Sequence, residues 1–152
     1  MTYLLDTVVL SEMRKQKKNV GLAAWIEKQR DLDLFVSAIS IGELERGICS
    51  IAKKDPEFAK ALGIWLDKLL MVYSDRILPV SFVTARRWGL LSVACGNAGA
   101  DILLAATALE HDCIVVTRNV RYFELTGVRT HNPWTTEGHS DPFAPCDLKN
   151  KF

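Results

Sequence analysis

The stretch ADILLAATALEHDCIVVTRN, residues 100–119, decides the fold class of this protein. Wound as a helix, its first part (100–112) is apolar almost all round, which predicts a helix buried on most sides. The run that follows at once, residues 113–117, has the strongest β propensity in the chain and predicts a buried strand. A buried helix that leads into a buried strand is typical of α/β folds.

The rest of the chain repeats this alternation of short apolar strands and helical periods. Further strands are expected at 2–5, 33–37, 77–80 and around 128–131. Helices are expected at about 8–16, 19–29, 39–54 and 83–96, with another that starts at Asp55-Pro56 and a helical turn at 119–127. The pattern predicts an α/β domain with a mostly parallel sheet over residues 1–134, followed by a polar C-terminal tail over 135–152.

The bulk composition is that of an ordinary globular protein. The 152 residues carry 19 Lys and Arg against 18 Asp and Glu, for a formal net charge of +1. This net charge does not indicate the basic domain that is typical of nucleic-acid-binding proteins. Two local basic clusters, RKQKK at 14–18 and Arg86-Arg87, are more often solvated helix ends than binding sites. No signal peptide is recognised, and no apolar run reaches the roughly 18 residues of a membrane span. We therefore expect a cytoplasmic protein.

The cysteines and histidines lack the spacing of a disulfide or zinc framework. No two cysteines form a CxxC pair, so we expect reduced thiols, three of the four filling the core. No histidines form an HxxxH or HExxH pair, which argues against zinc. The residues concerned are Cys49, Cys95, Cys113, Cys146, His111, His131 and His139.

Three acidic residues stand in apolar segments, where a carboxylate is costly unless it is paired, hydrogen-bonded or metal-bound. Asp6 ends the first strand, Glu43 lies in SAISIGELERGI, and Asp101 opens the buried helix. Taken singly, each has an ordinary structural interpretation. Asp6 and Asp101 can cap helices, and Glu43 can lie on the exposed side of an amphipathic helix.

Taken together, the acids favour a metal site, provided that the fold brings them to one edge of the sheet. In parallel sheets, functional side chains gather at the C-terminal ends of strands where the strand order reverses. Carboxylates that meet there repel one another unless a proton or a cation is bound. Mg²⁺ and Mn²⁺ prefer oxygen ligands, and such ions can activate a water and stabilise a phosphate that is being displaced.

Four blocks of sequence then follow one another in a characteristic order. They are LLDTVVLSEMRK, SAISIGELERGI, GADILLAATALEHDCIVVTRNVRYFELTGV and HNPW, which together run through nearly all of residues 3–134. In this order they resemble the PIN-domain endoribonucleases, most closely the VapC/FitB branch of bacterial toxin–antitoxin systems. The resemblance implies a PIN-like α/β/α sandwich that holds Mg²⁺ or Mn²⁺ and hydrolyses RNA phosphodiesters with a metal-activated water.

The resemblance also implies partners. It implies a homodimer, with the RNA substrate running over a shared groove. It implies a cognate antitoxin that inserts a segment into the acidic cleft, where an Arg from that partner can occupy the metal site. Operator DNA would be bound only through the antitoxin.

By resemblance, Asp6 matches the strand-end aspartate, Glu43 the helical glutamate, and Asp101 the aspartate that opens the buried helix. Asp6 and Asp101 are expected as direct metal ligands, with Glu43 as a further ligand or as the holder of a metal-bound water. Asn119 stands at a fourth position, which is Asp or Asn in the family. Because it is uncharged, Asn119 is expected to orient a water or a neighbouring carboxylate.

Three more residues are expected near the substrate. Thr7 and Ser40 can hydrogen-bond the carboxylates or a phosphate oxygen, although hydroxyls near helix starts are usually plain caps. Arg118 can contact the RNA backbone, although a surface ion pair is as good an interpretation.

Two positions depart from the family pattern. Val8 stands where the family usually has Asn, and Tyr122 stands where it commonly has Asp. Fewer polar groups in the site predict weaker divalent-cation binding than in a relative that has all the acids.

Two other interpretations compete with the nuclease. The first is a weakly catalytic PIN module that acts mainly within a DNA-binding toxin–antitoxin complex, and Val8 and Tyr122 give it some weight. The second is an aspartyl-phosphate enzyme with Asp6 as nucleophile. It is disfavoured because a haloacid-dehalogenase-like phosphatase needs a second Asp at the position of Val8.

Overall fold

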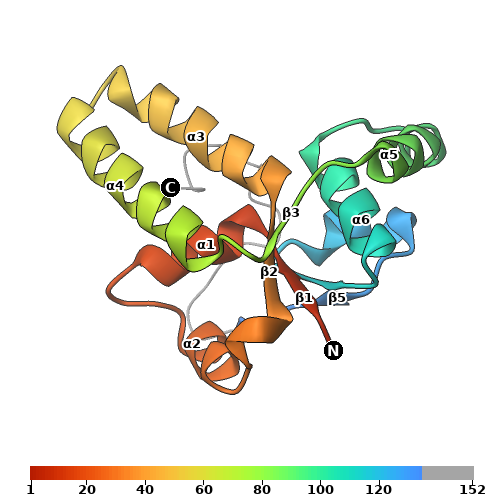
Figure 1. Cartoon of the computed structure of the whole chain (residues 1–152), viewed down its shortest axis with the longest axis horizontal. Coiled ribbons are helices and arrows are strands. Elements are labelled where there is room, and N and C mark those ends of the chain that lie inside the picture. Colours follow the sequence, from red (N-terminus) through yellow and green to blue (C-terminus); the bar gives the residue numbers. More distant parts are fainter. Residues whose placement is uncertain (135–152) are drawn as a thin grey trace.

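The computed structural model describes residues 1–134, and its centre is one five-stranded sheet (Figure 1). Neighbouring strands all pair in parallel, in the order β3-β2-β1-β4-β5. The strands are β1 (Tyr3–Leu5), β2 (Leu34–Ser37), β3 (Ile77–Leu78), β4 (Ile114–Val116) and β5 (Thr130–His131). The expected parallel α/β architecture is confirmed, whereas the expected polar tail at 135–152 lies outside the described residues.

Helices cover both sides of this sheet. In Figure 1 the first four helices lie on one side and the last two on the other. The helices are α1 (Thr7–Arg14), α2 (Val20–Glu27), α3 (Ala38–Ala52), α4 (Pro56–Val72), α5 (Phe82–Cys95) and α6 (Ala100–Glu110), with 3₁₀ turns η1 (Asp31–Asp33) and η2 (Val120–Thr126). Within residues 1–134, no helix combines the length and the apolar character that a membrane crossing requires.

Capping chemistry sets several helix ends. Asn19 accepts hydrogen bonds from two backbone N–H groups at the start of α2. Asp55 accepts one from the N–H of Phe58 at the start of α4, where Pro56 occupies the first turn. α5 ends at Gly96, whose φ of 63° is in the left-handed region that favours glycine. These are the ends that the sequence predicts.

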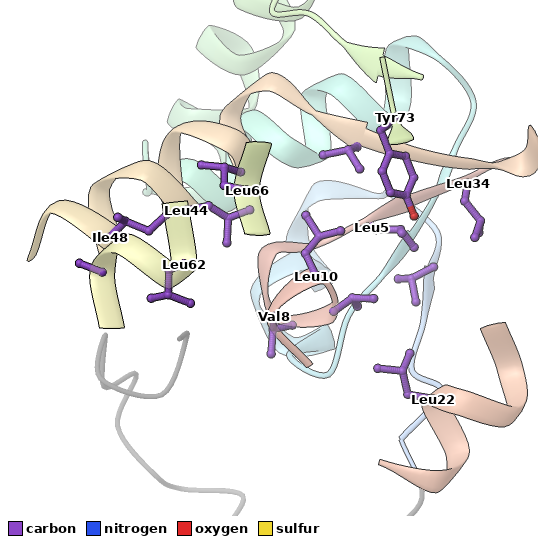
Figure 2. Close-up of a cluster of buried hydrophobic side chains, with 14 residues drawn as sticks. Leu5, Val8, Leu10, Leu22, Leu34, Leu44, Ile48, Leu62, Leu66 and Tyr73 are labelled. Atoms are coloured by element: carbon purple, nitrogen blue, oxygen red, sulfur yellow. The ribbon is translucent and has the colours of Figure 1, made fainter. Parts of the chain in front are cut away.

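The core has two parts because alternate residues of each strand face opposite sides of the sheet. Leu5 and Val116 face the cluster beneath α1 to α4, whereas Leu4 and Val115 face the cluster beneath α6 and η2. Figure 2 shows the first cluster, in which Leu44 of α3 lies against leucines of α4. This packing fixes α3 over the C-terminal end of β1, which is where the site forms.

Several expected element ends were wrong, among them those of the helices expected to reach residues 16, 29 and 54, which end at Arg14, Glu27 and Ala52. The strand expected at 77–80 stops at Leu78, because Pro79 has no N–H to donate to the sheet. The last strand, expected around 128–131, is only two residues long, Thr130–His131. The buried helix stops at Glu110 rather than at residue 112, because Asp112 adopts a left-handed conformation, with φ of 51°, to turn the chain into β4.

The expectation that three cysteines fill the core was also wrong. Cys113 is buried, but Cys95 is half-buried and Cys49 is exposed, and all three are free thiols. Ile48 is buried and Cys49 is the next residue along α3, a rotation of about 100° around the helix. An apolar sequence neighbourhood therefore does not decide which way a helical cysteine points. Cys146 lies outside the described residues.

Candidate active site

The strand order reverses between β1 and β4. Strands β1, β2 and β3 follow one another in one direction from this point, and β4 and β5 lie in the other. The backbone N–H of Asp6, just beyond β1, donates to the carbonyl of Val116 at the end of β4, with an N–O distance of 3.0 Å. The residues that follow both strands are therefore neighbours, at the place where parallel α/β sheets bind ligands.

Asp6 is only 4% exposed, and two hydrogen bonds offset the cost of burying it. Its Oδ1 accepts from the backbone N–H of Thr7 at 2.7 Å, which makes Asp6 the N-cap of α1. Its Oδ2 accepts from the hydroxyl of Thr117 at 2.7 Å. The capping role and a role in the site are thus compatible, since one oxygen fixes the helix and the other faces the end of β4.

Glu43 joins the same group through a hydroxyl. Thr7 is fully buried, and its Oγ1 donates to Oε1 of Glu43 at 2.8 Å. Because Thr7 follows Asp6 directly, one residue of α1 connects the carboxylates of Asp6 and Glu43. Glu43 is therefore not simply an outward-facing residue of an amphipathic helix, and Thr7 acts by holding a carboxylate.

Asn119 and Arg118 lie beside this group, after β4. The backbone N–H of Asn119 donates to Oγ1 of Thr117 at 2.9 Å, so the Thr117 hydroxyl both accepts from Asn119 and donates to Asp6. Arg118 is exposed, and its guanidinium carbon lies 6.0 Å from the ring centroid of Trp134. The two residues thus differ: Asn119 is tied to the buried group, whereas Arg118 faces solvent at its rim.

Arg118 also acts on Glu12 of α1. Burial alone would raise the pKa of Glu12, but hydrogen bonds from Lys15 and from the backbone of Asn19, together with the charges of Lys15 and Arg118, hold that pKa below its usual value. The Glu12 carboxylate therefore lies within the field of two cations, Lys15 and Arg118.

Asp101 and Ser40 are placed differently. Asp101 lies in the first turn of α6, a helix that contacts α3, and Gly99 rather than Asp101 is the N-cap of α6. Ser40 is fully buried one turn before Glu43, and its hydroxyl makes no hydrogen bond within residues 1–134. Within these residues, no three or more His, Cys, Asp or Glu side chains are grouped closely enough to hold a metal ion.

Thr117 is a site residue for which the sequence suggested a position but no role: it was recognised only as one of the polar residues after the apolar run at 113–117. It is the first polar residue after the apolar run of β4, just as Asp6 is the first after β1. In a parallel sheet such residues end side by side at one edge. The pairing register, which matches Leu5 with Val116, makes Asp6 and Thr117 the next pair along.

Comparison with known proteins identifies this arrangement. A family profile described as the PIN domain matches residues 3–128. The chain belongs to the PIN domain family. A VapC ribonuclease, Y4jK of Sinorhizobium fredii, is 32% identical to this PIN domain protein over 138 residues, which are 86% of this chain and 96% of the relative. The toxin FitB of Neisseria gonorrhoeae is 30% identical over 138 residues, 86% of this chain and 97% of the relative.

A solved structure agrees with the fold of this PIN domain. The structure of FitAB bound to an IR36 DNA fragment matches with a TM-score of 0.77 and 28% identity, over 91% of this chain and 100% of that chain. The α/β/α sandwich implied by the sequence resemblance is therefore confirmed.

The donor chemistry of the site fits a hard divalent cation. The side chains that are hydrogen-bonded together at the ends of β1 and β4 supply carboxylate and hydroxyl oxygens, and such oxygens are the ligands that Mg²⁺ and Mn²⁺ prefer. Two of the three expected acids, Asp6 and Glu43, are joined through Thr7.

Proposed function

We propose that this chain is a Mg²⁺- or Mn²⁺-dependent endoribonuclease and the toxin of a toxin–antitoxin pair. The observation that carries the proposal is the hydrogen-bonded chain from Glu43 through Thr7, Asp6 and Thr117 to Asn119, at the point where the strand order reverses. Relatives named VapC ribonuclease and toxin FitB support the choice of reaction and biological role.

In this proposal Asp6 and Glu43, which Thr7 joins, hold the cation, and Asp101 completes the ligand set when the cation binds. A bound divalent cation would supply an oriented, acidified water and would offset charge on the phosphate. Thr117 and Thr7 keep the carboxylates of Asp6 and Glu43 in fixed orientations, so that less reorganisation is needed when substrate arrives. Asn119, held by Thr117, orients a water or a neighbouring carboxylate.

The proposal extends to partners. An antitoxin would cover the acidic site and would provide the contact with operator DNA, as supported by the solved FitAB complex with DNA. A homodimer is supported by α5, where Phe82, Leu90 and Val93 are each at least three-quarters exposed. Apolar surface of this kind is typical of what homodimers bury.

The test is cleavage of total RNA by the purified protein, with the new RNA ends mapped by sequencing. We expect cleavage with Mg²⁺ or Mn²⁺, none in EDTA, and a rate about 10–100-fold lower for Asp101→Ala, because a metal-site residue is removed. Asp67→Ala, which changes an exposed aspartate of α4, is the matched control and should cleave at the wild-type rate. Cleavage that persists in EDTA, or an Asp101→Ala variant as active as the control, would contradict the proposal.

The departure at Tyr122 gives a second test, directed at the metal alone. Tyr122 is 36% exposed in η2, so an aspartate at this position is sterically tolerable. Tyr122→Asp is expected to tighten Mg²⁺ binding about tenfold, because it restores a carboxylate near the site. Calorimetric titration of wild type, Tyr122→Asp and the uncharged Tyr122→Asn measures this, and equal affinities for all three would show that the position does not influence the metal.

A further inference from the structure

A basic loop at residues 15–18 (KQKK) connects α1 to α2, and the proposed nuclease chemistry does not use it. With Arg14 it places four cations within five consecutive positions. Lys17 and Lys18 are exposed, and the interactions described within residues 1–134 give neither an acidic partner. The loop is therefore a local concentration of positive charge on a chain of nearly zero net charge.

The basic loop is held in one shape rather than left as a loose connection. Oε2 of Glu12 pairs with Nζ of Lys15 at 2.7 Å, and Oε1 of Glu12 accepts from the backbone N–H of Asn19 at 2.9 Å. Nζ of Lys18 donates to the carbonyl of Lys15 at 3.1 Å, a neutral acceptor that leaves its charge uncompensated. Glu12 thus ties both ends of the loop together, and the exposed charges of Lys17 and Lys18 lie on an ordered framework.

A groove of about 800 Å³ lies against the basic loop. Lys17 and Lys18 form part of its wall, and its apolar lining includes Met13 and Ile26. One acid, Glu27, also lines it. Lysines that line a groove suit a chain of phosphates, which single-stranded nucleic acid carries.

The basic loop and the acidic site lie at opposite ends of one short helix. Asp6 caps the start of α1, and Lys15 is the C-cap residue at its end. Eight helical residues span about 12 Å, which is the reach of a few nucleotides. The charge of Arg118, at the rim of the site, also helps to lower the pKa of Glu12, the residue that holds the loop. An RNA strand that leaves the site along α1 would meet the loop within a few nucleotides.

We propose that the basic loop binds the phosphate backbone of single-stranded RNA a few nucleotides away from the cleaved bond, with Lys17 and Lys18 as the contacts and Glu12 as the residue that positions them. This rests on the proposed function, since it assigns part of the substrate path of the same site. Charge complementarity favours RNA over an acidic protein segment, because lysines bind a regularly spaced phosphate chain without needing a particular sequence.

The test measures binding separately from cleavage. A short fluorescein-labelled single-stranded RNA is titrated with protein in EDTA, with fluorescence anisotropy as readout, at about 50 to 200 mM salt. The double variant Lys17→Ala/Lys18→Ala is expected to bind about tenfold more weakly at the lower salt concentrations. Its log–log salt slope should fall by about 1.4, or roughly 0.7 for each phosphate that a lysine no longer neutralises. Lys17→Arg/Lys18→Arg should bind like wild type.

The matched control is Lys53→Ala/Lys54→Ala. These two adjacent, exposed lysines lie in the turn between α3 and α4, far from α2 in Figure 1, and their removal changes net charge equally. Equal RNA affinities and equal salt slopes for the Lys17→Ala/Lys18→Ala and Lys53→Ala/Lys54→Ala variants would overturn the inference, even if the wild type cleaves RNA normally. If the wild type binds RNA but does not cleave it, the nuclease proposal fails while the binding surface stands. If the loop variant loses affinity for polyglutamate but not for RNA, the loop is a protein-docking surface and the inference is wrong.

Discussion

Replacing Asp6 with asparagine is expected to lower the rate of RNA cleavage by at least about 100-fold. The change removes the negative charge at the centre of the hydrogen-bonded group. A bound metal ion stabilises the transition state by several kcal/mol, and each loss of about 1.4 kcal/mol lowers the rate tenfold. The measurement is the initial rate of RNA cleavage in Mg²⁺.

The fold should survive this substitution. An asparagine Oδ1 still accepts from the N–H of Thr7, and the hydroxyl of Thr117 can rotate to accept from the new amide. The free energy of unfolding in urea should therefore change by no more than about 1 kcal/mol. Asp55→Asn is the control, because Asp55 is also an N-cap aspartate and asparagine caps about equally well. Full activity in Asp6→Asn, or a comparable decrease in Asp55→Asn, would remove the case for Asp6 as a catalytic ligand.

The largest expected effect on stability comes from Leu44→Ala. Leu44 is completely buried on α3, next to Glu43, and lies among Ile48 of the same helix and Leu62 and Leu66 of α4 (Figure 2). Truncating a buried leucine costs about 2–5 kcal/mol, because transfer free energy is lost and a cavity remains. For a chain of this size, each kcal/mol lowers the melting temperature by about 2–4 °C, so a fall of roughly 4–20 °C is expected.

Calorimetry or urea unfolding measures this effect. The control is Leu32→Ala in η1, whose side chain is 63% exposed, and its cost should lie within about 0.5 kcal/mol of zero. A cost below about 1 kcal/mol for Leu44→Ala would mean that α3 repacks easily, and that α4 does not hold Glu43 in place.

The fold was predictable because local signals and long-range packing agree. Strands β1 and β4 are continuous apolar runs, as expected for strands of a parallel sheet that helices cover on both faces. Caps such as Asn19 and Asp55 then set helix starts that periodicity alone leaves uncertain. Two of the errors arose where backbone geometry overrides composition, at Pro79 and at the left-handed Asp112.

The site was predictable only in part. The position of Asp6 at the end of a strand shows in the sequence, but the hydrogen bond between Thr7 and Glu43 joins residues 36 positions apart. It depends on how closely α1 approaches α3, which no local pattern encodes. The double role of the Thr117 hydroxyl depends in the same way on the register of β1 against β4. Whether Asp101 completes the group stays a prediction, and its variant tests it.

The margins of the sheet bear on how the protein behaves when concentrated. Both outermost strands, β3 and β5, are only two residues long, and Pro79 and Pro133 follow closely after them. Unpaired strand margins can recruit another chain and start fibrous aggregation, and short length and proline are two features that prevent this. The edge strands of this protein therefore offer few backbone N–H and C=O groups with which a strand of a second molecule could pair. We expect association between copies to proceed through side chains on helices rather than by continuation of the sheet.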